Sequence, residues 1–556
     1  MNSKLTPIWL AIAASLGILL GFILTKNAAQ SENSIILPNQ TSSSYSKLNE
    51  VLHLIDEAYV DTINKQKMVE DILPVVLKDL DPHSLYVPKD EVESMNEDLE
   101  GSFSGIGVQF NIQNDTVMIV DVIAGGPSEK LGILPGDRII MVNDSNFTGK
   151  TISNNAVVKK LRGTKGTKVK VGIKRNGSDQ IWDYTITRDD IPVNSVDIAY
   201  PISDGIGYLK VSRFGANTYQ EYLTQLMWLR EKEGCKDFII DLRNNSGGYL
   251  HAAILMVNEF LQRGQLIVYT EGKAFKREDA YADGTGRFAH NRICVLINEW
   301  SASASEIFAG AIQDQDRGWV IGRRSFGKGL VQQQMNLQDG SELRLTIARY
   351  YTPSGRCIQK PYKQGEIDQY DADIEKRYEN GEFFAQDSIV QNDSLAFQTR
   401  LGRTVYGGGG IMPDFFIGQD TTQYTPYYRQ VFNSMTLYNF CFNYTDKNRE
   451  TLKKYKTWQS LRQYLCTTAY LEEFLQFAES KGIKRNAKEI KQSEALIVNQ
   501  LQAYICRNML GDNGFYPILN LDDITVLKAI EVLQKGETIL PADPADRAAL
   551  EFLESL

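Results

Sequence analysis

The sequence predicts an α/β protein with a partly parallel central sheet, helices at both ends and a separate segment of short strands. In the middle of the chain, apolar runs of strand length alternate with stretches of helical spacing. Such alternation is typical of parallel sheets, because the connection between two parallel strands usually carries a helix. Before this part, short strands are interrupted by glycines, and helical periodicity dominates near both termini.

Length and composition set outer limits on partners and cofactors. The chain has 556 residues, enough for three or more domains, and a net charge of −9 without a basic block. Nucleic acid is therefore not expected as a partner. The six cysteines form no Cys-x-x-Cys pair and have no histidine spacing typical of zinc, so we expect neither a metal nor another cofactor.

The N-terminal segment, residues 1–27, contains a hydrophobic stretch. Residues 8–24 carry no charge and are flanked by Lys4 and Lys26. Seventeen residues are few for a membrane span and many for the hydrophobic part of a signal peptide. Because no clean small-x-small cleavage site follows Lys26, we favour an uncleaved anchor over a removed signal, with residues 28–46 as a polar linker. In both cases the remainder would be exported.

Two amphipathic helices are expected within residues 47–100. Apolar residues recur at helical spacing, first at Leu48, Val51, Leu52 and Ile55, and then at Val69, Ile72, Leu73, Val76 and Leu77. The turn Asp81-Pro-His-Ser should end the second helix. Its His83 is one of four histidines, and for each of them we expect a structural role; the other three are His53, His251 and His290.

Between about residues 101 and 190, glycine-rich turns separate short strands. The loop Gly105-Ile106-Gly107-Val108 leads into a strand, and a helix is expected over residues 154–161. Backbone N–H groups of such a loop can hold a carboxylate while an extended peptide adds to an open sheet edge. In this order the features resemble a PDZ domain, in which Val157 and Leu161 would line the peptide groove. The alternative is that the glycines only form a hairpin.

Residues 191–425 are expected to form the α/β core. Strands are predicted over residues 205–211, 237–242, 293–297 and 319–322, with helices over residues 219–233 and 252–262 between them. Residues 341–351 alternate well enough for a further strand. Residues 370–392 are charged and irregular, which favours a loop or cover.

A serine cluster lies between the strand 293–297 and an Ala-rich helical stretch that begins near Ile307. A nucleophile can be exposed on such a strand-to-helix turn, beside a backbone N–H and a helix N-terminus. The alternative is simpler, because Ser303-x-x-Glu306 is also a good capping box, and helix caps are far commoner than nucleophiles.

Two other segments favour catalysis over capping. Lys328 stands between two glycines that allow close approach of backbone and ligand. Gln332 follows four residues later, on the same face of an extended segment as Lys328. A second buried strand ends in Gly247-Gly248, whose N–H groups are candidates to point at an anion.

Four motifs occur in a characteristic order: Asp-Leu-Arg-Asn-Asn-Ser-Gly-Gly (241–248), Ser-Ala-Ser-Ala-Ser-Glu (301–306), Phe-Gly-Lys-Gly-Leu-Val-Gln (326–332) and Tyr-Thr-Pro-Ser-Gly-Arg (351–356). Together they resemble the C-terminal processing peptidases, or tail-specific proteases, of family S41, from about residue 48 to about residue 417. The resemblance implies a core related to crotonase and Clp-type peptidases. It also implies that Ser303 is the nucleophile, that Lys328 is the general base and that Gln332 orients the lysine.

The resemblance raises two further residues for consideration. In this family an arginine of the PDZ module helps to couple tail binding to activation, and Arg138 is the nearest candidate. Asp314 matches an acidic position discussed in the family, although it would also serve to end its helix.

The expected chemistry requires a neutral lysine. An unperturbed lysine has a pKa of about 10.4, which burial or nearby positive charge lowers, and Arg323 and Arg324 are candidate sources of that charge. The tetrahedral oxyanion requires two donors, for which we expect the N–H of Ala304 and that of Gly247 or Gly248.

The sequence therefore predicts a PDZ domain over residues 101–190, a serine peptidase core over residues 191–425 and a helical domain over residues 426–556. Its substrates would be proteins with apolar C-terminal tails. It would lie on the periplasmic side of the inner membrane, anchored by its N-terminal helix or exported after cleavage. A homodimer or higher oligomer and an activating adaptor protein stay open as partners. The alternatives are a PDZ scaffold or chaperone with a silent core, and a small-ester hydrolase that uses His251 or His290.

Overall fold

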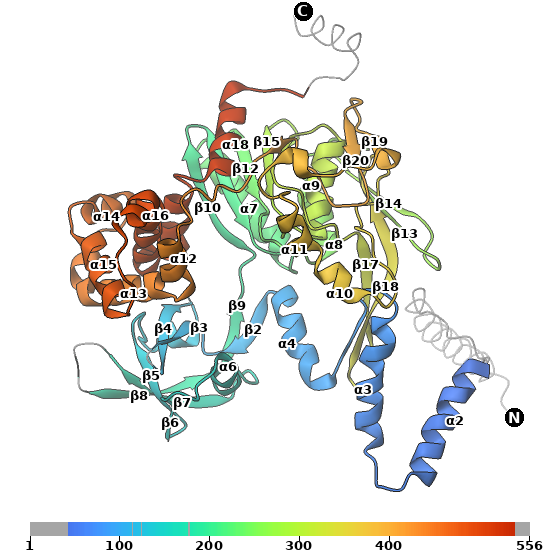
Figure 1. The fold of residues 1–556 in the computed structure, drawn as a ribbon, viewed down its shortest axis with the longest axis horizontal. Helices are drawn as coiled ribbons and strands as arrows, with labels where there is room; N and C mark the ends of the chain where they lie inside the picture. Colours follow the sequence, from blue (N-terminus) through green and yellow to red (C-terminus); the bar gives the residue numbers. More distant parts are fainter. Residues whose placement is uncertain (1–42, 114, 124, 176–177, 179, 540–556) are drawn as a thin grey trace, which may run out of the picture. The chain divides into compact units, whose positions relative to one another are not determined.

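The computed structural model describes residues 43–539, apart from residues 114, 124, 176, 177 and 179 (Figure 1). The hydrophobic stretch 8–24, for which we predicted an anchor or signal, lies outside the described residues. Among the helices of the described part, none is both long and apolar enough to span a bilayer. The chain forms two compact units, residues 1–72 and 73–556.

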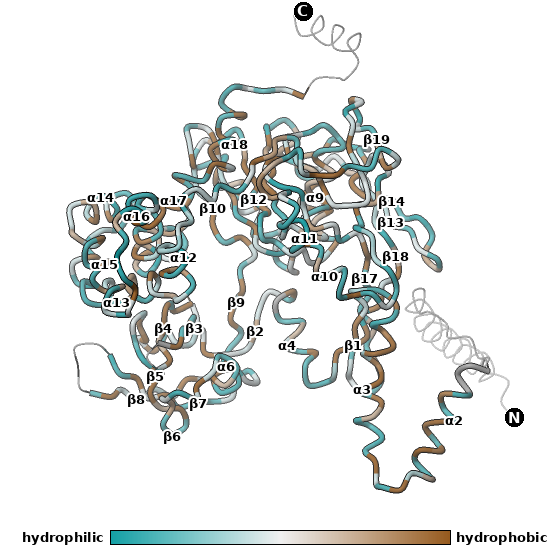
Figure 2. Tube along the Cα trace, viewed as in Figure 1, coloured by the Kyte–Doolittle hydropathy of each residue, from teal (hydrophilic) through white to brown (hydrophobic). Residues whose placement is uncertain are grey.

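The described part of the first unit consists of α2 (Ser43–Ala58) and the first turns of α3 (Lys65–Lys78). Both helices follow the predicted spacing of apolar residues. Two of these apolar side chains on α2, Leu48 and Val51, are nevertheless exposed. Figure 2 shows the hydrophobic stretches along this helix.

The second unit is built on a six-stranded sheet in the order β10-β11-β12-β15-β16-β21. The first pair is antiparallel, and all other neighbours in this sheet are parallel. The strands are β10 (Val196–Ser203), β11 (Ile206–Val211), β12 (Asp237–Asp241), β15 (Ile293–Ile297), β16 (Trp319–Gly322) and β21 (Phe415–Phe416). This is the partly parallel α/β core that the sequence predicts.

The two faces of this sheet bury different residues of the same strands, as the period of two in a strand requires. From β15, Ile293 and Val295 pack into a core with three helices: α7 (Thr218–Glu231), α8 (Leu250–Asn258) and α9 (Ala304–Asp314). Cys294 and Leu296 pack instead with side chains of α18 (Ile524–Lys535). We had assigned this last helix to the C-terminal domain, whereas its apolar face covers the central sheet.

A second, antiparallel sheet stands beside the first. Its long strand β18 (Glu342–Tyr351) pairs with β13 (Leu266–Glu271), β17 (Leu330–Asn336) and the short β1 (Leu85–Val87). The strand β14 (Glu278–Tyr281) completes it on β13. Because β1 follows the Asp81-Pro-His-Ser turn directly, this turn is held close to β18.

Residues 102–192 form the predicted segment of short strands. Its main sheet has the order β3-β4-β5-β7-β8, so that β3 lies at an edge of this sheet within the described residues. Its strands are β3 (Val108–Gln113), β4 (Thr116–Val122), β5 (Arg138–Val142), β7 (Lys168–Lys174) and β8 (Ile181–Thr187). Helix α6 (Asn154–Leu161) packs on it, and β2 (Ser102–Gly105) pairs with β9 (Asp189–Pro192). In the sequence, helix α4 (Lys89–Glu100) lies between β1 and β2.

Six helices follow the core: α12 (Pro426–Asn433), α13 (Thr436–Leu452), α14 (Trp458–Leu465), α15 (Tyr470–Ser480), α16 (Ala487–Leu510) and α17 (Asp512–Leu519). Their apolar faces form one hydrophobic core. This is the helical domain that the sequence predicts after the core. The stretch expected to be irregular, residues 370–392, contains the end of α10 (Ile367–Asp371) and the short helix α11 (Asp373–Glu379), and after residue 379 it is mostly turns and irregular chain.

Candidate active site

Ser303 lies at the junction of the buried strand β15 and helix α9. Its backbone has a φ of 55° and a ψ of −114°, a conformation that residues other than glycine seldom adopt. An ordinary helix cap is extended, so this conformation is a departure that costs on the order of 1–3 kcal/mol. Such strain is typical of a nucleophile held on a sharp strand-to-helix turn.

The serine turn is fastened to the Gly247-Gly248 loop. The N–H of Ala302 donates to the carbonyl of Asn245 at 3.0 Å, and the Ser305 hydroxyl donates to the same carbonyl at 2.9 Å. The loop approaches Ser303 so closely that a Cβ on Gly247 would lie 2.7 Å from the Ser303 Cβ. Only glycine fits at residue 247 in this arrangement.

Glu306 connects the nucleophile to the lysine segment. One of its oxygens, Oε2, accepts from the N–H groups of Ser303 and Lys328, each at 2.8 Å. The other, Oε1, accepts from the N–H of Gly327 at 2.7 Å and from the Ser325 hydroxyl at 2.5 Å. Burial raises the pKa of Glu306 to about 7, against the opposing effect of these donors. The carboxylate therefore accepts from the cap residue as the capping interpretation expects, and it also holds the segment 325–328.

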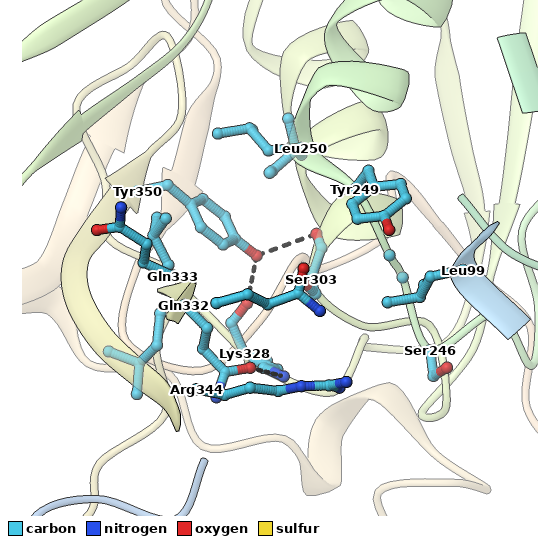
Figure 3. A pocket seen from close by; sticks show the side chains of 16 residues that line it. Leu99, Ser246, Tyr249, Leu250, Ser303, Lys328, Gln332, Gln333, Arg344 and Tyr350 are labelled. Carbon is cyan, nitrogen blue, oxygen red and sulfur yellow. Dashed lines mark hydrogen bonds between the residues drawn. The ribbon is translucent and has the colours of Figure 1, made fainter. Parts of the chain in front are cut away.

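Ser303, Lys328 and Gln332 line the same pocket of about 510 Å³ (Figure 3). Lys328 Nζ donates to Gln332 Oε1 at 3.2 Å. Gln332 Nε2 in turn donates to the carbonyl of His83. These three predicted residues come together from a helix start, a loop and the strand β17, although 24 residues lie between the serine and the lysine.

Burial lowers the pKa of Lys328, and the nearby Arg344 lowers it further, whereas Glu306 and Asp81 raise it. The positive charge thus comes from Arg344 on β18 and not from the arginines that we expected. Arg323 pairs with Glu299 at 2.8 Å, and Arg324 pairs with Glu382 at 2.6 Å.

Tyr350 is a site residue that the sequence reasoning missed. Its hydroxyl lies 3.0 Å from the carbonyl oxygen of Ser303 and also contacts the carbonyl of Lys328. With a single proton to share, the phenol bridges the two segments. It stands directly before the Tyr-Thr-Pro-Ser-Gly-Arg motif, but no spacing rule places it at the serine.

The structure distinguishes between the expected oxyanion donors. The N–H of Gly247 donates to the Asn245 side chain at 2.9 Å and is therefore occupied. The N–H groups of Ala304 and Gly248 make no hydrogen bond within the described part of the chain. Gly248 also lines the pocket with Ser303, so Ala304 and Gly248 are the available pair.

Asp314 and the histidines have other surroundings. Asp314 makes a fully buried ion pair with Arg356 at 2.7 Å, which joins helix α9 to the Tyr-Thr-Pro-Ser-Gly-Arg turn. His251 and His290 are exposed, and neither lines the pocket. All four histidines are among the described residues, and none of them lines the pocket with Ser303 and Lys328.

The loop Gly105-Ile106-Gly107 leads into the edge strand β3 at Val108, as predicted. Gly107 has a φ of 74°, and Ile106 is buried, with its carbonyl accepting from the N–H and hydroxyl of Ser128. Val157 and Leu161 are only 0% and 4% exposed and belong to the core of this module. We expected these two residues to line an open groove. The spacing of apolar residues on a short helix does not distinguish those that fill the core from those that face a groove.

Arg138 does not lie where we expected the coupling arginine. It projects from β5 and pairs with Asp446 of α13 at 3.1 Å. The arginine beside the Gly105 loop is Arg162, which follows α6, stacks 4.3 Å from the Phe103 ring centre and forms an ion pair with Glu97 of α4. A Cβ on Gly105 would contact the Arg162 side chain.

Comparisons with known proteins identify relatives of this chain and of its domains. The model of peptidase family S41 matches residues 205–369, a PDZ domain model matches residues 104–184, and a family of unknown function matches residues 427–511. The chain is 35% identical over 372 residues to the carboxy-terminal processing protease CtpA of Bacillus subtilis, covering 65% of this chain and 78% of that protein.

Two further relatives illustrate the range of similarity. The carboxy-terminal-processing protease of Bartonella bacilliformis is 35% identical over 331 residues, covering 58% of this chain and 75% of that protein. Among solved structures, the photosystem II D1 C-terminal processing protease is 23% identical with a TM-score of 0.34, covering 69% of this chain and 95% of that one. The chain belongs to the carboxy-terminal processing proteases of peptidase family S41, and it is a serine endopeptidase with a PDZ domain.

Proposed function

We propose that this protein is an exported protease that cleaves protein substrates with a Ser303–Lys328 dyad, after its PDZ domain has bound their apolar C-terminal tails. The observation that carries the proposal is the common pocket of Ser303, Lys328 and Gln332, with Lys328 Nζ 3.2 Å from Gln332 Oε1. A buried lysine whose pKa is lowered can be neutral, and only a neutral amine can accept the proton of the serine.

In the proposed mechanism, Ser303 Oγ attacks the scissile carbonyl carbon while Lys328 Nζ takes the hydroxyl proton. The oxyanion that forms is held by the N–H groups of Ala304 and Gly248. Lys328 then returns its proton to the departing amine, which leaves an ester on Ser303. A water molecule, deprotonated by the same lysine, attacks this ester, and collapse of the second tetrahedral intermediate releases the acid and restores the serine.

Tail recognition is proposed to use the edge of β3. A peptide that adds there as a further strand would place its carboxylate at the Gly105–Val108 loop. Arg162 would then couple binding to catalysis, because it lies beside this loop and pairs with Glu97 of α4. Leu99 of the same helix lines the catalytic pocket.

Membrane attachment is a further part of the proposal. It rests on the uncharged stretch 8–24 and on the lack of a clean cleavage site after Lys26. Full-length protein on the periplasmic side of the inner membrane should sediment with membranes and resist extraction by alkaline carbonate. A mature N-terminus between residues 26 and 34 would instead establish a removed signal peptide.

The dyad is tested with a substrate protein that ends in an apolar tail. We expect wild-type enzyme to degrade it and Ser303→Ala to leave it intact. Lys328→Arg keeps the positive charge but stays protonated, so it should be nearly as inactive as Ser303→Ala. Activity in Lys328→Arg above a tenth of wild type would refute the lysine as base.

A further inference from the structure

The turn formed by residues 81–84, just before β1, touches the catalytic apparatus without a role in the proposed mechanism. From the sequence we expected only that this turn ends the preceding helix. In the structure its His83 carbonyl accepts a hydrogen bond from Gln332 Nε2. A carbonyl oxygen can only accept, so it selects the amide end of the Gln332 side chain. Gln332 Oε1 is thereby left facing Lys328 Nζ.

The turn is itself rigidly held by one buried carboxylate. Asp81 Oδ1 accepts from the N–H groups of His83 at 2.8 Å and Ser84 at 2.9 Å, and Oδ2 accepts from the Ser84 hydroxyl at 2.5 Å. Asp81 is 6% exposed and Ser84 is 7% exposed. Little of this turn can move without breaking several hydrogen bonds at once.

The anchor of the turn on β18 is the residue opposite Gln332. Thr346 donates its hydroxyl to Asp81 Oδ1 at 2.9 Å and its N–H to the Ser84 hydroxyl at 3.0 Å. In the β17–β18 pair, Thr346 is the registered partner of Gln332. The turn and the glutamine are therefore fixed to the same point of the sheet.

The turn also contributes to the charge around the lysine. The groups that act on Lys328 are Glu306 from α9, Arg344 from β18 and Asp81 from the turn. The fourth neighbour is His83, whose imidazole contacts the Tyr370 hydroxyl at 2.9 Å. Burial, together with the positive charge of Lys328, lowers the pKa of His83 to about 3, so this ring stays neutral at working pH.

We propose that the 81–84 turn is a positioning element of the catalytic base, which orients Gln332 through the His83 carbonyl and faces Lys328 with the charge of Asp81. This inference rests on the proposed Ser303–Lys328 dyad. With Gln332 held in this orientation, Lys328 donates one N–H to Oε1 and keeps its lone pair for the serine proton. With the amide reversed, the Gln332 NH₂ group would face Lys328 and compete for that lone pair.

A double-mutant cycle tests the orienting role. Thr346→Val keeps the shape of the side chain but removes the hydroxyl that holds Asp81. We expect it to lower kcat about tenfold at unchanged KM, because residues 81–84 are not among the residues that line the pocket. In a Gln332→Ala background the same change should cost less than about twofold, since the group that it positions is gone. Equal costs in both backgrounds would overturn the proposal.

The charge of the turn is tested by pH. Asp81→Asn keeps acceptor oxygen for the turn but removes the negative charge that raises the pKa of Lys328. The acid limb of the kcat/KM profile should therefore move to lower pH. The matched control is Asp339→Asn, which removes a charge from the turn before β18, where Asp339 Oδ1 accepts from the N–H and hydroxyl of Ser341. The control should leave the limb in place.

The remaining outcomes separate this inference from the dyad itself. Unfolding temperatures of all variants show whether a loss of rate reflects loss of fold, and the position of the pH limb does not depend on the amount of folded enzyme. If Asp81→Asn and Asp339→Asn give the same limb as wild type, the electrostatic role is refuted. If Lys328→Arg is active, the proposed dyad is wrong. If Lys328→Arg is inactive but the effects of Thr346→Val and Gln332→Ala are additive, only the positioning role of the 81–84 turn is refuted.

Discussion

Replacing Gly247 by alanine should inactivate the enzyme by displacing its nucleophile. The added Cβ would lie 2.7 Å from the Ser303 Cβ, 2.8 Å from the Ala302 carbonyl oxygen and 3.0 Å from the Ala304 nitrogen. All three atoms belong to the serine turn, and two of them are backbone atoms that cannot rotate away. Ser303 must therefore shift, or the loop must withdraw from it.

The energetic cost has two parts that the structure separates. Gly247 has a φ of +102°, and such a backbone costs an alanine roughly 1–2 kcal/mol. Overpacking against the serine turn adds about 1–3 kcal/mol. Gly264 provides the matched control, because its φ of +83° brings the same kind of strain but no atom lies within 4 Å of its Cβ position. Gly264→Ala should lose only the first part.

The assay combines unfolding temperature, turnover and labelling of the nucleophile by a fluorophosphonate. A displacement of about 1 Å at a reacting atom can cost a hundredfold in rate. We therefore expect Gly247→Ala to lose about that much turnover and most of its labelling, and Gly264→Ala to retain both. If Gly247→Ala keeps half of the wild-type turnover at equal folded concentration, the close packing of the loop on Ser303 is wrong.

Three other perturbations have a defined direction. Lys328→Met should abolish turnover yet unfold at a higher temperature near neutral pH, because a buried, protonated lysine with a lowered pKa destabilises the folded protein. In the wild type this destabilisation decreases as the pH rises, and the variant should lack this gain in stability. Equal unfolding temperatures across that pH range would contradict this. Glu306→Gln should lower both stability and kcat, since an amide oxygen can accept from only one of the two donor pairs and the NH₂ group then faces the other pair. Each buried donor left without an acceptor should cost about 1–3 kcal/mol of stability. Unfolding in urea at the wild-type concentration would contradict this expectation. Amidating the C-terminus of the substrate should slow cleavage about tenfold or more, because the PDZ loop then lacks its carboxylate, and equal rates for acid and amide would remove that role from the Gly105 loop.

The sequence was most informative where chemistry and local structure coincide. Apolar runs such as residues 293–297 become buried strands because both of their faces are covered, and residues on sharp turns between such strands and helices have few possible positions. Ser303 and Lys328 could therefore be placed in the correct elements. That they share a pocket followed from the resemblance to a family, because strand order and loop approach are not encoded in spacing.

What the sequence missed depends on long-range pairing. Arg344 faces Lys328 because β18 pairs with β17, whereas Arg323 and Arg324 are near Lys328 only in the sequence. Arg138 and Arg162 are both arginines at the border of a regular element, and only the fold puts Arg162 beside the Gly105 loop. Likewise, no local signal indicates that the N–H of Gly247 is occupied by Asn245.

The arrangement of polar groups explains why strain and buried charge gather at this site. Ser303 is held in an unfavourable conformation, and Lys328 is placed where its charged form is disfavoured; each alone would relax by moving away. Glu306 and Tyr350 prevent this, since each contacts the backbone of both segments and leaves the Ser303 and Lys328 side chains free for chemistry. Because these contacts are to main-chain atoms, replacing either the serine or the lysine side chain leaves them intact. Variants at Ser303 or Lys328 should thus lose activity without losing the fold, whereas variants at Glu306 should lose both.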